Sequence, residues 1–393
     1  MAPNNSQAAP PAQYTREMNE YAKGLVLARS IDMWQSIDSR VLSGVIPGQV
    51  VNIPVRNVGL IKKFWVEISF TLTQAAAESL ARTTLGAANI LSQVIFTDLS
   101  NQTRVNTTGW HLHWLASLRR QGVFGGAFTN DSPTSFGSNM PVIVAPTPIT
   151  TGQTVRMFYE VPISYGDYDL RGGIYASVVN STMNLQLTVN PNLVVGSAAN
   201  PTLAAYQSST ANDVGLITNF TVTTYQNYLD QVPMTAEGPV LPLLDLSTAY
   251  LLNNTVATGM SVNQDFAIPY ANFRDFLSTF FIYDNFGGAG AIGTNLTALK
   301  LQSANYTNII NIDQYVSSLM ARNILRDDLP AAALRESYLL DSRRKPISTV
   351  QYGNMQAVLN LANVAGAASR VLVGYEALSI INQITQAGSL YNT

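Results

Sequence analysis

The sequence predicts an all-β protein built from two eight-stranded jelly-roll barrels in one chain, with short helices in loops and a helix near the N-terminus. Three observations carry this prediction. Short stretches that alternate apolar and polar residues recur along the 393 residues, separated by turn signals. A stretch from Tyr225 to Pro242 contains three prolines and divides two such series, since proline interrupts helices and central strands. Finally, IPVRN at 53–57 matches IPYAN at 268–272, which indicates a repeat.

Residues 1–47 are predicted to form an N-terminal arm and helix. The stretch 1–13 is mainly Asn, Gln, Ala and Pro, and this composition favours a flexible arm. Apolar residues at spacings of three and four predict a helix over Tyr14–Ala28. Arg16, Lys23 and Arg29 make it basic, so they are the candidate membrane-facing residues. Two placements stay open: the helix lies on an anionic membrane, or it packs under its own barrel.

Residues 48–232 are predicted to form the first jelly roll. Its strands are expected at 49–56, 64–71, 90–98, 155–163, 183–189 and 217–225, each with alternating or continuous apolar residues. A short helix is expected over Gly109–Arg120, where two arginines suit a helix C-terminus. Another, weakened by glycines, is expected within Tyr165–Val178. The long Gly- and Pro-rich stretch 122–152 is expected to make contacts.

Residues 233–381 are predicted to repeat this plan as the second jelly roll, and residues 382–393 form a polar C-terminal tail. Strands are expected at 266–270, 273–284, 298–312, 337–340, 349–361 and 370–381. A helix is expected over Asp313–Arg326, because its apolar residues share one side and Asp313 is a good N-cap.

Composition limits the class of function. Charged residues make up 12% of the chain, against about 25% in soluble proteins. Polarity comes instead from Asn, Gln, Ser and Thr, which favours a β-protein that uses much of its surface in contacts with neighbours. The net charge of −2 indicates no direct contact with nucleic acid. The chain has no cysteine, hence no disulfides, and shows neither a signal peptide nor a membrane-spanning run.

No motif in the sequence predicts a catalytic, cofactor-binding or metal-binding residue. GAGAIG at 288–293 matches a dinucleotide fingerprint, but a strand-like stretch follows it where a helix is required. His111 and His113 are the only histidines; no third ligand lies nearby, so we expect them to be packed and hydrogen-bonded. The Asn-x-Ser/Thr triplets are attributed to chance, and Arg343–Lys345 to a solvated corner or a subunit boundary.

Several separate stretches resemble the major capsid protein of the tectiviruses, tailless icosahedral phages with an internal membrane. They are YQNYLDQVP at 225–233 with LPLLDLSTAYLLNN at 241–254, TGWHLHW at 108–114, FAIPYANFRDFLSTFFIYDN at 266–285, RRKPISTVQYGN at 343–354 and VLVGYEA at 371–377. The resemblance spans about Val45 to Ala377.

The resemblance implies a structural protein and no enzyme. It implies a double jelly roll that forms a homotrimer, in which six similar barrels tile like a hexamer within an icosahedral shell. Neighbouring trimers, penton and minor capsid proteins, and the internal viral membrane are the implied partners. The implied location is the virion capsid, assembled in the host cytoplasm. Two other classes stay open from the residues alone: a secreted lectin-like β-sandwich binding protein, and a β-rich hydrolase.

Overall fold

The computed structural model describes most of the chain between Arg16 and Ile380. The described residues are 16–73, 80–83, 89–119, 153–176, 182–199, 203–209, 216–235, 238–239, 248–260, 264–284, 296–313, 316, 333–337, 346–361 and 369–380. The predicted loop 122–152, the GAGAIG stretch and the tail 382–393 lie outside them. Within the described residues, no helix is long and apolar enough to cross a membrane.

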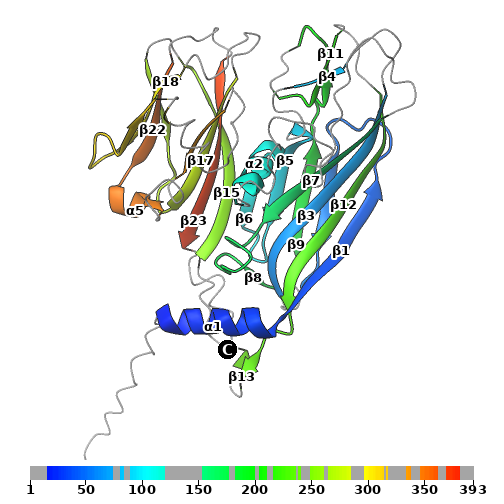
Figure 1. Ribbon diagram of the computed structural model, residues 1–393, viewed down its shortest axis with the longest axis vertical. Coiled ribbons are helices and arrows are strands. Elements are labelled where there is room, and N and C mark those ends of the chain that lie inside the picture. Colours follow the sequence, from blue (N-terminus) through cyan, green and yellow to red (C-terminus); the bar gives the residue numbers. More distant parts are fainter. Residues whose placement is uncertain are drawn as a thin grey trace, which may run out of the picture.

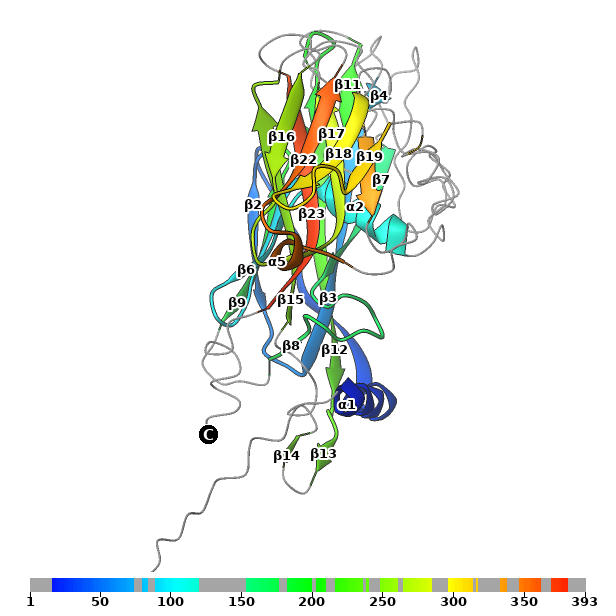
Figure 2. The same cartoon turned by 90° about the vertical axis from the view of Figure 1, so that its left-hand side faces the viewer.

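Two β-barrels stand side by side, with their strands running along the long axis of the molecule (Figures 1 and 2). In the described part of the first barrel, eight principal strands form two sheets, ordered β1-β12-β3-β7 and β2-β9-β5-β6. The strands are β1 (Ile31–Val41), β2 (Val50–Val55), β3 (Leu60–Thr73), β5 (Leu91–Thr97), β6 (Thr103–Thr107), β7 (Gln153–Pro162), β9 (Met183–Val189) and β12 (Leu216–Asp230).

The second barrel repeats this topology, again with eight principal strands among its described residues. Its sheets are ordered β15-β23-β17-β20 and β16-β22-β18-β19. The strands are β15 (Thr248–Thr258), β16 (Asp265–Pro269), β17 (Asp275–Asp284), β18 (Leu296–Ser303), β19 (Ile310–Ile312), β20 (Ala333–Ser337), β22 (Met355–Leu361) and β23 (Arg370–Ile380). The fold prediction of two eight-stranded jelly rolls is therefore confirmed.

Short elements decorate the barrels. The helices are α1 (Arg16–Arg29), α2 (Gly109–Arg119) and α5 (Thr349–Tyr352). The short strands are β4 (Leu80–Arg82), β8 (Ile174–Tyr175), β10 (Val194–Val195), β11 (Tyr206–Ser208), β13 (Met234–Thr235), β14 (Gly238–Pro239) and β21 (Ile347–Ser348). Helix α1 crosses the base of the molecule, and α2 lies between the barrels (Figure 1).

The repeat seen in the sequence is a structural equivalence. Ile53 lies on β2 opposite Leu185, and Ile268 lies on β16 opposite Ala357. Both strands are the outer members of their sheets and are followed by the first long strand of the opposite sheet, β3 or β17. The sequence offset between Ile53 and Ile268 persists into these strands, because it also separates Leu60, where β3 begins, from Asp275, where β17 begins.

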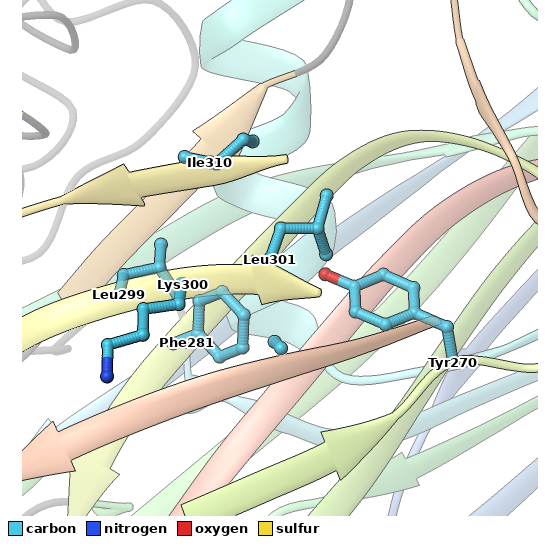
Figure 3. Close-up of a pocket in the computed structure, with 7 residues that line it drawn as sticks. Tyr270, Phe281, Leu299, Lys300, Leu301 and Ile310 are labelled. Carbon is cyan, nitrogen blue, oxygen red and sulfur yellow. The ribbon is translucent and has the colours of Figure 1, made fainter. Parts of the chain in front are cut away.

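Alternating side chains fill each barrel. In β3 the even-numbered residues from Phe64 to Leu72 are buried, and Phe70 stacks on Phe220 of β12 at 5.3 Å between ring centroids. In the second barrel, Tyr270 and Phe276 meet edge to face at 4.6 Å. Figure 3 shows a hollow there, lined by Tyr270, the stem of Lys300 and mainly apolar side chains such as Leu301; it is too small to hold a water molecule.

Four expectations from the sequence need correction. Residues 31–41, expected in the arm-and-helix region 1–47, form β1, which pairs with β12 and belongs to the first barrel. Strand β12 continues through Asp230, past its expected end at Tyr225, because it pairs with both β1 and β3. Residues 165–176 form turns and β8 instead of a helix, since glycines interrupt them. Residues 349–352 form α5, so the expected strand 349–361 begins only at Met355.

Candidate assembly surfaces

The two barrels share one sheet. Strand β6 of the first barrel pairs in parallel with β15 of the second, with Val105 opposite Leu252 and Asn106 opposite Asn253. This pairing joins two four-stranded sheets into a nine-stranded sheet, counting β21, within the described residues. Backbone hydrogen bonds therefore connect the barrels in addition to side-chain contacts.

Helix α2 fills the space between the barrels. His111 of α2 is fully buried; its ring lies 5.5 Å from that of Phe280 on β17, between centroids, and contacts the backbone at Gly374 on β23. The His111 Nδ1 atom and the Thr107 hydroxyl are 2.6 Å apart, within hydrogen-bond distance. His113 is also buried. Both histidines are packed in the interior, and His111 is hydrogen-bonded, as the sequence predicts; His111 also contacts the second barrel.

The outer face of β23 belongs to this inter-barrel contact. Alternate residues of β23 point into the second barrel, and the others, including Gly374, Glu376 and Leu378, face the first. The Glu376 carboxylate is buried and accepts hydrogen bonds from the Tyr250 and Ser278 hydroxyls at 2.9 and 2.6 Å. Tyr250, Leu252 and Leu378 pack into the hydrophobic core of the first barrel. The contact between barrels is therefore built like a protein interior.

A buried ion pair braces the same region. Arg104 of β6 donates to the Asp98 carboxylate at 2.6 Å, and both side chains are at most 2% exposed. Arg104 also donates to the carbonyl oxygen of Gly172, whose backbone lies against Tyr250. Burial lowers the pKa of Arg104, while the charge of Asp98 and its hydrogen bond oppose that effect. The pair thus ties the β5–β6 turn to the loop that supports the second barrel.

The opposite end of the first barrel is open. Strand β1 pairs only with β12 among the described strands, so its other edge has no partner there. Ile31, Trp34 and Val41 are exposed along it. On the outer face of the β1-β12-β3-β7 sheet, Trp34 meets Trp65 edge to face at 5.0 Å, and Trp65 meets Phe158 at 6.4 Å. Exposed aromatic side chains on a sheet edge favour a protein contact.

Helix α1 closes the base of the first barrel (Figure 2). Its residues Ala22 and Val26 are fully buried against Leu60, Leu170 and Leu229. The sequence left two placements of the helix open, on a membrane or under its own barrel. The face that carries Ala22 and Val26 packs under the barrel.

The candidate membrane-facing residues are not equivalent. Arg29 is exposed, whereas Lys23 forms an ion pair with Glu20 at 2.5 Å. Arg16 begins the helix, and its side chain lies outside the described residues. Near Lys23, Arg171 forms an ion pair with Asp169 at 2.6 Å. The outer surface of α1 is therefore mixed in charge.

The sequence patterns did not single out Gly374, at the contact between the barrels, or the aromatic pair Trp34–Trp65, on the outer face beside the strand β1. Each had a signal. Gly374 interrupts the apolar run VLVGYEA, and a lone glycine in a strand marks a close approach by another segment. Trp34 stands at the fading end of the helical pattern, although it alternates with polar residues in IDMWQS. In the described part of the chain, no group of three His, Asp or Glu residues is arranged to hold a metal ion.

Comparisons with known proteins agree with this arrangement. The STIV MCP (Sulfolobus Turreted Icosahedral Virus) superposes with a TM-score of 0.65 at 9% identity, covering 92% of this chain and 100% of that one. The PBCV-1 virus capsid gives 0.59 at 12% identity, covering 89% and 95%. In sequence, the major capsid protein P3 of Enterobacteria phage PRD1 is 35% identical over 392 residues, 98% of this chain and 97% of that one.

Two jelly rolls joined side by side in one chain define the double jelly-roll class of virus capsid proteins. The profile of the P3 major capsid protein N-terminal region matches residues 35–232, and that of its C-terminal region matches residues 247–392. The chain belongs to the P3 major capsid protein family. It is a structural component of the virion capsid and not an enzyme, which replaces the lectin-like and hydrolase alternatives.

Proposed function

We propose that three copies of the chain form a closed ring of six barrels, and that these trimers tile an icosahedral shell around a membrane-enclosed genome. Neighbouring trimers and penton and minor capsid proteins are the further partners. The trimer rests on one observation: the contact inside the chain joins unlike ends of two similar barrels. The first barrel contributes its β6 end and α2, and the second contributes β15 and the outer face of its sheet.

Among the described strands, this contact leaves one end of each kind without a partner. The second barrel keeps its β19 end, the counterpart of the β6 end, and the first keeps its β1 end, the counterpart of the β15 end. Unlike ends support a head-to-tail contact, and such contacts form closed rings where the rotation allows it. Two barrels per chain make a ring of six from three chains. The low content of charged residues, 12%, suits the large buried contacts of obligate assemblies, about 2,000 Å² or more.

The native mass tests the trimer. Each chain weighs 42.5 kDa, and the expected species at nanomolar concentration has three times that mass, by mass photometry or native mass spectrometry. A species of 42.5 kDa under these conditions contradicts the proposal.

We propose also that the outer surface of α1 faces the internal membrane. Support comes from its place at the base of the molecule and from the exposed side chains of Tyr21 and Arg29. A short, mixed-charge surface binds weakly in one copy and gains strength through many copies in a shell. The double variant Arg16→Gln/Arg29→Gln should keep its native mass and stability but bind anionic vesicles less well when assembled. Lys300→Gln, on the second barrel, is the matched control.

A further inference from the structure

The strand pairings show which residues occupy equivalent positions in the two barrels, and such residues are called counterparts. Trp34 lies opposite Asn227, which lies opposite Lys63 on β3. In the second barrel, Leu252 lies opposite Glu376, which lies opposite Ser278 on β17. Lys63 and Ser278 are separated by the same sequence offset that relates Ile53 to Ile268. Trp34 is therefore the counterpart of Leu252, and the next residue, Gln35, is the counterpart of Asn253.

The other side of the inter-barrel contact can be traced in the same way. Val105 lies opposite Phe96, which lies opposite Leu185. Ile310 lies opposite Leu301, which lies opposite Ala357. Leu185 and Ala357 are counterparts, because they face Ile53 and Ile268. Ile310 is therefore the counterpart of Val105, and Asn311 that of Asn106.

The equivalence continues past the ends of these strands. Thr108 precedes α2, and its carbonyl oxygen accepts a hydrogen bond from the Leu112 amide. Its counterpart, Asp313, accepts a hydrogen bond from the Val316 amide at 2.8 Å, which is the contact of a helix N-cap. Of the expected helix 313–326 the structure describes Asp313 and Val316, and this side-chain contact differs from the backbone contact of Thr108 at the start of α2. By this count Val316 is the counterpart of His111.

The counterparts Leu252 and Trp34 differ in their exposure to solvent. Leu252 is fully buried beside Val105, whereas Trp34 is 45% exposed. Among the described strands, β19 pairs only with β18 and β1 only with β12, so one edge of each is open. The contact that β15 makes inside the chain is the one that β1 lacks.

We infer that β19 of one copy pairs in parallel with β1 of the next, with Ile310 opposite Trp34 and Asn311 opposite Gln35. This inference rests on the proposed trimer and specifies its contact. The pair Val105–Leu252 and Asn106–Asn253 supplies the template. Val316 then lies over Trp65 and Tyr225, the counterparts of Phe280 and Gly374, as His111 lies over those two residues.

The outer face of the β1-β12-β3-β7 sheet is suited to burial by this partner. Its charges already have partners: Arg156 pairs with Glu67 at 2.6 Å, and Lys63 lies 2.6 Å from Asp167. A buried charge without a partner is strongly destabilising. Covering this face would bury charges that are already paired, so this cost does not arise. Tryptophan side chains are also the residue type most enriched among residues that dominate binding energy.

Disulfide trapping tests the register, because the chain has no cysteine of its own. Partner residues on adjacent strands lie about 4.8 Å apart, within the range that a disulfide spans. The double variant Gln35→Cys/Asn311→Cys, once its native mass confirms assembly, is treated with a mild oxidant. A denaturing gel without reductant should show covalently linked trimers that revert to monomers on reduction.

Three controls frame the result. Asn106→Cys/Asn253→Cys reproduces the same geometry inside one chain, so it should lose its free thiols without forming larger species. Ser39→Cys/Asn311→Cys shifts one partner by four residues, about 13 Å along the strand, and should not cross-link. Each single variant should remain monomeric on the same gel.

The possible results distinguish a wrong strand register from a wrong trimer proposal. A trimeric native mass with an oxidised intrachain control, but no link between Gln35→Cys and Asn311→Cys, overturns the register and leaves the trimer standing. Links of equal yield in the Ser39→Cys control overturn it as well. A monomeric native mass for the unmodified chain removes both proposals.

Discussion

Gly374 lies so close beneath the His111 ring that a Cβ atom placed on Gly374 would lie 2.9 Å from the ring carbon Cγ. His111 belongs to α2 beside the first barrel, and Gly374 belongs to β23 of the second. The missing side chain at position 374 is what allows the helix to approach the sheet. A single glycine therefore fixes how closely the two barrels pack.

The substitution Gly374→Ala should destabilise the folded chain by about 1–3 kcal/mol, the usual cost of overpacking a core. The added methyl group must displace the His111 ring, which is itself held between Phe280 and Thr107. Urea unfolding followed by tryptophan fluorescence measures the change. Gly24→Ala is the control for added volume, because nothing lies within 4 Å of a Cβ there; in the interior of α1 it should leave stability unchanged or raise it by up to about 1 kcal/mol. Equal midpoints for both variants would contradict this account.

The substitution Trp34→Glu should weaken assembly at least tenfold while leaving the melting temperature of the isolated chain nearly unchanged. Trp34 is 45% exposed, so its replacement disturbs little of the barrel, yet the proposed contact with Ile310 would bury a charge. Dilution series by mass photometry give the dissociation constant. Phe273→Glu, at an aromatic residue 79% exposed on the second barrel, should assemble normally. Comparable weakening by both variants would show that position 34 is not special.

Removing one partner of the Asp98–Arg104 pair should be costly. Arg104→Met leaves the buried Asp98 carboxylate with the Ser100 and Gln102 amides but without a cation. A loss of about 3–5 kcal/mol is expected, as for other broken buried pairs. The double variant Asp98→Asn/Arg104→Met should recover part of it, since no lone charge remains. Chemical denaturation of the two variants measures the difference, and equal losses would contradict this explanation.

The Asp169–Arg171 pair should contribute to stability at neutral pH and lose that contribution in acid. Burial alone raises the pKa of Asp169, but the hydrogen bond and charge of Arg171 outweigh it, so the pKa is lowered overall. The unfolded carboxylate then binds protons at higher pH than the folded one, and the stabilisation disappears as pH falls below about 4. Asp169→Asn should therefore be less stable than the unmodified chain at pH 7 and match it more closely near pH 3. A constant difference across this range would assign the effect to packing.

Local patterns in the sequence are sufficient for most of the fold. Alternation in Phe64–Phe70 and the IPxxN repeat predict the strands and the two barrels, because side-chain period and turn chemistry act over a few residues. The buried histidines are recognised for the same reason, since no partner for catalysis or metal binding stands near them in the sequence.

The contacts between barrels cannot be predicted in this way. Trp34 follows a helical pattern in the sequence, yet its strand is formed by pairing with Asn227, at the far end of the first barrel's sequence. Likewise, Gly374 takes its meaning from His111, and the sequence gives no register between them. Where a strand is stabilised mainly by a distant partner, its own residues carry a weak signal.

The two faces related by the repeat differ in polarity. The β23 face, covered inside the chain, carries Leu372 and Leu378, the hydrogen-bonded Glu376 carboxylate and, at the far end of the strand, the Arg370–Asp284 ion pair. Its counterpart on the first barrel mixes tryptophans with Lys63, Glu67 and Arg156. The two barrels of one chain are covalently linked, which gives the contact between them a high effective concentration. The β23 face is therefore buried as soon as the chain folds. In the single chain the second face is exposed to water, and its paired charges should oppose non-specific association there.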